Sequence, residues 1–408
     1  MLFTKFIFKN SLKVIFFKIQ YFVKKDYLLD CFISESIGGN IAVEKPSSID
    51  GRLVINPSVA MSVYCYSILR LDPFIGCGHG CVYCYTRYLP FYSDQVTVLV
   101  NYPRLFEKFL DKVYGSGVRL PAFRLSALTD PFQPAEERFK LSYRLLKVCL
   151  EKKQHVIVST KSDLLVKEPW VDVIKELAGE GLAVVQFTVT LLEDEKAKVI
   201  EPNAPSPSKR LKAAELLASE GVPVVFRLQP LIPYVNSSDE FLEEYVDVAK
   251  SIGVKQIICE AYRFLQWSEL EVFKDLLSPE EFRELLLRSK WERLFKSSHK
   301  VPRREWRLNR YRFLRDLCVK KGILFSLCRE ELFELSTAPN CCGMHFMKNY
   351  VVRETIREVL GKGDPYAKIL TLSDIEKIPF KAVREKLKQH YLLLRKYISE
   401  RKSYPKES

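Results

Sequence analysis

Short apolar runs rich in β-branched residues recur along the first two thirds of the chain, and helical patterns fill the intervals between them. The runs are YSILRLDPF (66–74), AFRLSAL (122–128), HVIVST (155–160), AVVQFTVT (183–190), VPVVFRLQP (222–230) and KQIICEAYRF (255–264). Strands this apolar are typical of a parallel sheet that is covered on both faces. Strands that alternate with helices predict parallel βα units, and no GxGxxG motif follows any of these runs. We therefore predict an α/β fold, a partial or full β/α barrel and not a Rossmann sheet.

The rest of the chain is predicted to be mainly helical and basic. After about residue 270 the pattern changes to charged helices, except for the cysteine-bearing stretch 325–345, and residues 373–402 are expected to form one long basic helix. We divide the chain into a basic N-terminal extension, the barrel, a helical C-terminal region with a second group of cysteines, and a basic helical tail. Their ranges are 1–50, 51–270, 271–345 and 346–408.

Polar residues follow the apolar runs at the point where each predicted strand ends. Three cysteines follow the first run, and the segments TDPFQPAEE, TKSDLL, TLLEDEKAKVIEPNAP and QPLIP follow the next four. The chemistry of a β/α barrel takes place at the carboxyl ends of its strands. We therefore expect these segments to meet around one site.

The segment CGHGCVYC places Cys77, Cys81 and Cys84 on one short loop. Three thiolates do not complete a tetrahedral zinc site. His79 could supply a fourth ligand, although the glycines on either side of it indicate a tight loop. A [4Fe–4S] cluster normally takes four cysteines, so three would leave one iron open to an exogenous ligand. A zinc site completed by a distant residue, or three thiols without a metal, are the alternatives.

The loop resembles the signature of radical S-adenosylmethionine enzymes, C-x3-C-x2-C with an aromatic residue, Tyr83, before the third cysteine. The segments DPFIGCGHGCVYCYTR, TDPFQPAE, TKSDLLVKE, EPNAPSPSKRL and LQPLIP resemble the branch related to spore photoproduct lyase, in the same order, from about residue 55 to 264. The resemblance implies a partial (β/α)6 barrel with a helical C-terminal extension. It also implies a [4Fe–4S] cluster on the three cysteines, S-adenosylmethionine on its open iron, and an external one-electron donor.

The resemblance further implies that one electron cleaves S-adenosylmethionine to methionine and a 5′-deoxyadenosyl radical, which abstracts hydrogen from an unidentified substrate. The residues that match cofactor contacts of the family are Tyr83, Thr129, Asp130, Thr160, Lys161, Thr188, Thr190 and Arg227. Strand-end threonines are also common on propensity alone, and an aspartate before proline often starts a turn. The family's lyase carries a cysteine just before the position of Thr129. This chain has Ala127 and Leu128 there, so the lyase reaction itself is not implied.

Cys328, Cys341 and Cys342, with His345 nearby, form a second group. They could bind an auxiliary cluster, place a thiol near the radical, or serve as small buried residues in a loop. The other cysteines lie in apolar surroundings and are predicted to belong to the core. They are Cys31, Cys65, Cys149, Cys259 and Cys318.

The formal charge of +14 allows an acidic or nucleic-acid partner. Arginines alternate with Trp306, Tyr311 and Phe313 in the segment KVPRREWRLNRYRFLRDLCVKK, a composition found on nucleic-acid surfaces. The same composition fits a basic amphipathic helix that closes a barrel. The alternative function is therefore a nucleic-acid-binding protein whose cysteine loop holds a structural metal.

Eleven cysteines cannot all pair, and a chain of 408 residues with 47% hydrophobic residues needs no disulfide staples. We therefore predict a reducing, cytoplasmic location. The lysine-rich N-terminal extension contains no apolar run near the roughly 18 residues that a membrane-spanning helix needs. We expect a solvated or docked extension there and no transmembrane segment.

Overall fold

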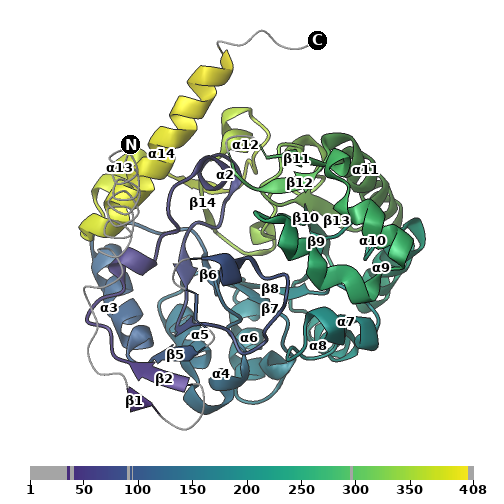
Figure 1. Ribbon diagram of the computed structural model, residues 1–408. Helices are drawn as coiled ribbons and strands as arrows, with labels where there is room; N and C mark the ends of the chain where they lie inside the picture. The colour runs from purple at the N-terminus through teal and green to yellow at the C-terminus, as the bar shows by residue number, and fades with distance from the viewer. Residues whose placement is uncertain (1–34, 37–40, 90–91, 94, 295–296, 403–408) are drawn as a thin grey trace, which may run out of the picture.

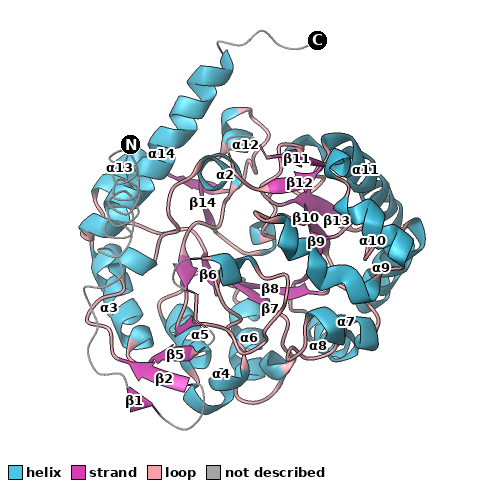
Figure 2. Ribbon diagram, viewed as in Figure 1, coloured by secondary structure: helices cyan, strands magenta, loops and turns pink. Residues whose placement is uncertain are grey.

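The computed structural model describes residues 35–36, 41–89, 92–93, 95–294 and 297–402. Its centre is a seven-stranded sheet in which every neighbouring pair is parallel, in the order β13-β10-β9-β8-β7-β6-β3 (Figures 1 and 2). The strands are β3 (Arg70–Leu71), β6 (Phe123–Leu125), β7 (Val156–Thr160), β8 (Ala183–Thr188), β9 (Val224–Leu231), β10 (Gln256–Ala261) and β13 (Leu324–Leu327).

All six predicted strands are present, and the α/β fold of a partial barrel is confirmed. The seventh strand, β13, lies in a region that was expected to be helical. Its four residues pair with Gln256–Cys259 of β10, and Phe325, Ser326 and Leu327 are buried. Pairing with the edge of the sheet satisfies the backbone of this short apolar segment.

Helices follow the strands and bury one face of the sheet (Figure 2). They include α3 (Tyr102–Gly115), α5 (Leu141–Glu151), α6 (Trp170–Gly179), α8 (Pro207–Ser219), α9 (Asp239–Ile252) and α11 (Arg304–Lys321). Helix α9 is capped at both ends, because the Ser238 side chain accepts from Phe241 N and Gly253 ends the helix at φ 86°. The helical pattern between the second and third apolar runs forms two helices, α4 (Pro134–Phe139) and α5, because Lys140 between them has φ 49°.

The other face of the sheet, inside the barrel, is filled by a segment of the C-terminal region, residues 340–352, which we call the plug. Its Met344 and Val352 pack against Ile157, Val184 and Val225 of three strands. Polar anchors hold it as well. Gln186 Nε2 donates to Cys342 O at 2.7 Å, and Lys348 N donates to Gly181 O at 2.9 Å. The plug therefore closes one end of the barrel.

A smaller sheet of order β1-β2-β5-β4 lies beside the barrel. Its strands are β1 (Glu35–Ser36), β2 (Ile41–Glu44), β4 (Phe74–Ile75) and β5 (Val96–Leu99). Most of the predicted N-terminal extension, with Cys31, lies outside the described residues. Within the part of that extension that is described, β2 pairs in parallel with β5.

The predicted C-terminal helix over 373–402 is divided into α13 (Leu372–Glu376) and α14 (Lys381–Lys402). Helix α14 reaches back to α2 (Val59–Tyr64), where His390 Nδ1 lies 2.9 Å from Ser62 Oγ. In the portion of the chain that the structure describes, no helix combines the length and the apolar character that crossing a membrane requires.

Gly343 tests how tightly the plug is packed. It has φ 73°, and a Cβ there would lie 3.2 Å from both Val184 Cγ2 and Val225 Cγ2. Gly361 has a similar φ of 68° but open space around it. Gly361→Ala should cost about 1–2 kcal/mol of unfolding free energy because alanine is strained at this φ. Gly343→Ala should cost at least about 1 kcal/mol more, because it also overpacks the barrel. Equal losses in urea unfolding would show that the plug is loose.

Candidate active site

One large cavity opens at the carboxyl ends of the strands. It has a volume of about 1110 Å³, including its open mouth. All three loop cysteines line it, as do seven of the eight predicted cofactor contacts: Tyr83, Thr129, Asp130, Thr160, Lys161, Thr188 and Arg227. The eighth, Thr190, is fully buried and lies 3.1 Å from the Tyr83 hydroxyl. The strand ends therefore meet around one space, as the sequence predicts.

The cysteine loop is held by backbone contacts to two other strand-end segments. Gly78 N donates to Gln133 Oε1 at 2.8 Å, and Asn203 N donates to His79 O at 3.2 Å. Gly80 has φ 64°, in the left-handed region that favours glycine. The tight loop inferred from the glycines is therefore present, and its path is fixed from both sides.

The three thiols of this loop are close enough to affect one another electrostatically. Burial raises the pKa of Cys77 and of Cys81 to about 12, and each pKa is raised further by the Cys84 thiol. The Lys161 ammonium acts in the opposite direction on Cys81. Buried thiols beside a cation are suited to ligating an electropositive centre that replaces their protons. Within the described ranges, no three His, Cys, Asp or Glu side chains converge enough to hold a single metal ion.

His79, considered as a fourth ligand, instead faces Asp130. Its Nδ1 lies 3.5 Å from Asp130 Oδ2, and both side chains are buried. Thr160 Oγ1 donates to Asp130 Oδ1 at 2.6 Å, and Lys161 N donates to Oδ2 at 2.7 Å. Burial alone would raise the pKa of Asp130, but His79 and these hydrogen bonds outweigh it and lower the pKa to about 2. Asp130 therefore ties two strand ends to the cysteine loop.

Tyr83 lies at the centre of a second buried network. Its hydroxyl donates to Glu201, and Glu201 forms an ion pair with the fully buried Arg210. The Lys161 ammonium lies 5.5 Å from the centroid of the Tyr83 ring. Burial would raise the pKa of Glu201, but Arg210 and Lys161 lower it, so the carboxylate is charged. This network fixes the Tyr83 ring next to the cysteines.

Several of these supporting residues were not singled out from the sequence. Gln133 belongs to the segment TDPFQPAE, and Glu201 and Arg210 belong to EPNAPSPSKRL, both of which carried the family resemblance. Asp72 belongs to DPFIG and accepts from Ala127 N at 2.8 Å and Leu128 N at 2.9 Å. Their place in these motifs was the only signal that the sequence offered. The roles of these residues depend on contacts between distant segments, which spacing along the chain does not reveal.

Two arginines lie inside the barrel near the plug. Arg124 Nη1 and Arg227 Nη1 each donate to Gln186 Oε1 at 2.9 Å. Arg124 Nη2 also lies 3.5 Å from Cys342 Sγ. Burial, followed by repulsion from Arg124, lowers the pKa of Arg227. Arg227, which the family pattern suggests as a cofactor contact, therefore shares its surroundings with a second buried cation.

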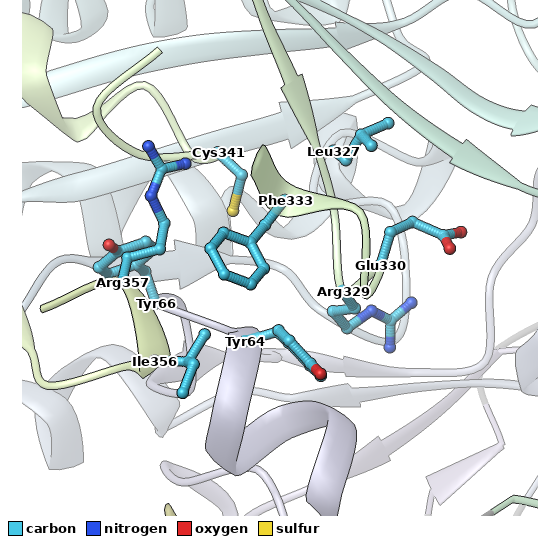
Figure 3. Close-up of a pocket in the computed structure, with 9 residues that line it drawn as sticks. All are labelled: Tyr64, Tyr66, Leu327, Arg329, Glu330, Phe333, Cys341, Ile356 and Arg357. Carbon is cyan, nitrogen blue, oxygen red and sulfur yellow. The ribbon is translucent and has the colours of Figure 1, made fainter. Parts of the chain in front are cut away.

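The second cysteine group reaches the same cavity. Cys328 and Cys342 line it, whereas Cys341 lines a smaller pocket of about 280 Å³ with Tyr64, Tyr66 and Phe333 (Figure 3). Cys341 Sγ lies 3.7 Å from Cys342 Sγ. A hydrogen bond from Cys341, with Arg329 and Arg227 nearby, outweighs burial and lowers the pKa of Cys328 to about 6.

The remaining cysteine predictions divide between core and cavity. Cys149, Cys259 and Cys318 are buried in the core, as expected. Cys65 is also buried, but it lines the cavity. His345, which was grouped with the second cysteines, lies beside Phe346, with the ring centroids 4.1 Å apart and the rings tilted by 43°.

The basic segment after residue 300 forms β12 (Lys300–Pro302) and then helix α11, which packs on α9 and β13. Tyr311 is fully buried and donates to Glu330 Oε1 at 3.0 Å. Trp306 and Phe313 are half-buried against the core. The helix therefore closes the barrel, and Tyr311 is not exposed for stacking on a base.

The Glu201–Arg210 ion pair gives a stability test. Arg210→Met leaves a buried carboxylate without its counter-ion, which typically costs about 3–5 kcal/mol. Lys175→Met is the control, because it breaks an exposed ion pair with Glu220 and should cost at most about 1 kcal/mol. Similar unfolding free energies in urea for the two variants would contradict the assigned role of Arg210.

The pKa of Cys328 gives a pH test. A thiol with a lowered pKa is a thiolate over more of the accessible pH range, and the thiolate is the nucleophile. Alkylation of Cys328 by iodoacetamide, followed by peptide mass spectrometry, should therefore rise with pH and reach half its maximal rate near pH 6. Cys149, which is fully buried, should stay unmodified. A Cys328 profile that rises only near pH 8–9, as for a free cysteine, would contradict the arrangement of the second cysteine group.

Residues 71–246 match the family model described as the radical SAM superfamily. An uncharacterised protein of Methanocaldococcus jannaschii is 27% identical over 224 residues, which cover 53% of this chain and 74% of that protein. Two point variants of spore photoproduct lyase superpose with TM-scores of 0.50 and 0.51, at 15% and 14% identity. They cover 70% and 76% of this chain and 81% and 93% of their own chains, which shows a shared fold. Residues 71–246 thus match the radical SAM superfamily, and the chain shares the fold of spore photoproduct lyase.

Proposed function

We propose that this protein binds one [4Fe–4S] cluster on Cys77, Cys81 and Cys84 and S-adenosylmethionine beside it, and that it abstracts hydrogen from a substrate held in the same cavity. The observation that carries the proposal is that cavity. One space joins the three cysteines of the loop to polar side chains that follow β6, lie at the ends of β7 and β8, and lie within β9. A structural metal loop gives no reason for this convergence.

The donor set fits the cluster. Three thiols on one glycine-bearing loop face one space, while the neighbouring acceptors His79 and Asp130 are paired with each other. A four-iron cluster held by three cysteines keeps one iron for an exogenous ligand. When bound, the cluster and S-adenosylmethionine would supply a 5′-deoxyadenosyl radical by one-electron reductive cleavage of the sulfonium. The electron comes from an external donor.

The residues around the loop divide into those that would touch the cofactor and those that position them. Tyr83, Thr129, Thr160, Lys161 and Thr188 line the cavity, and we assign them to the adenine, amino, carboxylate and ribose groups of S-adenosylmethionine. Asp130 also lines the cavity, but Thr160 Oγ1, Lys161 N and Phe132 N donate to its carboxylate. Asp130 and Thr190 therefore act mainly as positioning residues for the loop and for Tyr83.

The cavity limits the ways in which a reactive species could be lost. The plug fills the barrel at one end, and the cysteine loop is braced from both sides at the other. Walls of this kind exclude water and stray hydrogen donors from a reactive centre. The chain's own contribution to the reaction is binding, orientation and exclusion of solvent.

The substrate is not inferred from spore photoproduct lyase. Ala127, in the place where that lyase carries a cysteine, lines the cavity and offers no thiol. The thiols that do line it beyond the cluster loop come from Cys65, Cys328 and Cys342. A nucleic-acid substrate is compatible with the basic chain, and comparing product formation with and without nucleic acid would test it.

Anaerobic reconstitution tests the function. The wild-type chain should bind about four irons and four sulfides and, with dithionite, form 5′-deoxyadenosine from S-adenosylmethionine. Single alanine variants of Cys77, Cys81 and Cys84 should lose at least about 90% of this product, because each removes one of three cluster ligands.

The matched control for these variants is Cys318→Ala, which removes a buried thiol in helix α11, outside the cavity. It should keep the iron content and the product yield. Cysteine-loop variants that still formed 5′-deoxyadenosine, or a wild-type chain that contained zinc and no iron, would overturn the proposal in favour of a structural metal loop.

A further inference from the structure

We propose that Arg124 and Arg227 form a binding site for an oxyanion of the substrate, a phosphate or a carboxylate, on the cavity wall beside the plug. The inference rests on the proposed function, since it takes the cavity to be the place of the reaction. It goes further because it names the chemical class of group that the substrate must carry.

The two guanidinium groups meet at one neutral atom. Each donates to Gln186 Oε1 at 2.9 Å, and the Ser159 hydroxyl donates to the same oxygen at 2.9 Å. Across the described ranges, no Asp or Glu oxygen lies within 4.0 Å of a nitrogen of either arginine. Two like charges around one amide oxygen repel each other, and partly buried charges are costly unless they are paired. The arrangement therefore lacks an anion.

The nearby carboxylate does not supply it. Glu260 lies 2.9 Å from Arg263 Nη2 and 2.9 Å from Arg329 Nη2, so two other cations already share it. Arg329 itself lines the cavity. This wall therefore carries more arginines than carboxylates, and Glu260 acts on Arg227 only from beyond ion-pair distance.

The neighbouring thiols balance the excess only in part. Cys342 Sγ lies 3.5 Å from Arg124 Nη2, and its pKa is lowered by a hydrogen bond from Cys341 and then by Arg124 and Arg227. Arg227 also helps to lower the pKa of Cys328 to about 6. A thiolate offers a single weakly accepting sulfur, whereas a carboxylate or phosphate offers two or three oxygens. The planar guanidinium fork matches such oxyanions in a bidentate way. An oxyanion is therefore the better partner for the donors that face the cavity.

The cavity wall offers two separate groups of side chains. The cofactor contacts assigned above belong to the cysteine loop and the ends of β6, β7 and β8. Arg124 and Arg227 are linked instead to Gln186 and, through Cys342, to the plug. The two groups of residues can serve two ligands at once.

The test titrates the reconstituted full chain, by calorimetry, with phenyl phosphate, benzoate and benzyl alcohol. The three probes share a ring and differ in charge and anion type, so they separate a phosphate from a carboxylate site. The wild type should bind one of the two anions at least about tenfold more tightly than benzyl alcohol, since charge-assisted hydrogen bonds are the stronger kind. Arg124→Gln and Arg227→Gln should each weaken the binding of that anion at least about tenfold and leave the affinity for benzyl alcohol unchanged.

Two further sets of variants act as controls. Arg283→Gln removes an exposed arginine in helix α10 (Pro279–Leu286) and should bind the anion as the wild type does. Arg124→Lys and Arg227→Lys keep the charge and lose the fork, so they should show intermediate affinity. The lysine variants also provide the measurement if a glutamine variant fails to fold.

The outcomes separate this proposal from the proposed function. A wild type that binds neither anion, or arginine variants that bind it normally, would overturn the oxyanion site even if 5′-deoxyadenosine forms. Arginine variants that weaken the binding of S-adenosylmethionine and not that of the anion would overturn it too, because the arginines would then belong to the cofactor-binding site. Anion binding that depends on both arginines would support the site. If the same chain formed no 5′-deoxyadenosine, the proposed function would be refuted and the oxyanion site would stand.

Discussion

The buried contact between Glu201, Arg210 and Tyr83 holds the site together. Glu201 accepts from the Tyr83 hydroxyl and pairs with Arg210, and Arg210 donates to Thr188 O at 3.2 Å and Pro205 O at 2.7 Å. One carboxylate thereby connects the cysteine loop to the end of β8 and to the segment that precedes α8. Buried charges persist only where such partners satisfy them. The orientation of the Tyr83 ring, and with it the wall beside the cysteines, depends on this one pairing.

Asp130 performs a comparable task from the opposite side. It joins His79 of the loop to Thr160 and to the backbone of Lys161, and this arrangement keeps the carboxylate charged. The loop therefore lies between two buried carboxylates, each compensated by its own cation or hydrogen bonds. Such preorganised polar groups position ligands without reorganising during a reaction. This explains how a short loop with several glycines can keep three thiols directed into one cavity.

Much of the fold follows from local patterns in the sequence. The apolar runs predicted six of the seven strands of the barrel, and the position of polar residues after them predicted a shared site. Strand β13 was missed because its apolar run is short and lies in a region that is otherwise rich in charged helices. The split at Lys140 was missed because a positive φ at lysine is set by packing. Cys65, which looks like a core residue in the sequence, lines the cavity because the chain brings it beside Cys328 and Cys342. Gln133, Glu201 and Arg210 act through contacts between distant segments, which spacing along the chain does not encode.

The cavity combines two chemical surroundings, a cysteine loop with polar strand ends and a wall of arginines and thiols beside the plug. The central claim concerns the first, a cluster with three cysteine ligands and one iron open to S-adenosylmethionine. Electron paramagnetic resonance of the dithionite-reduced, reconstituted full chain tests it most directly. We predict the signal of a reduced [4Fe–4S] cluster whose g-values change when S-adenosylmethionine is added, because in the proposed function the cofactor would coordinate the open iron. A signal that S-adenosylmethionine leaves unchanged, or no cluster signal at all, would contradict the account.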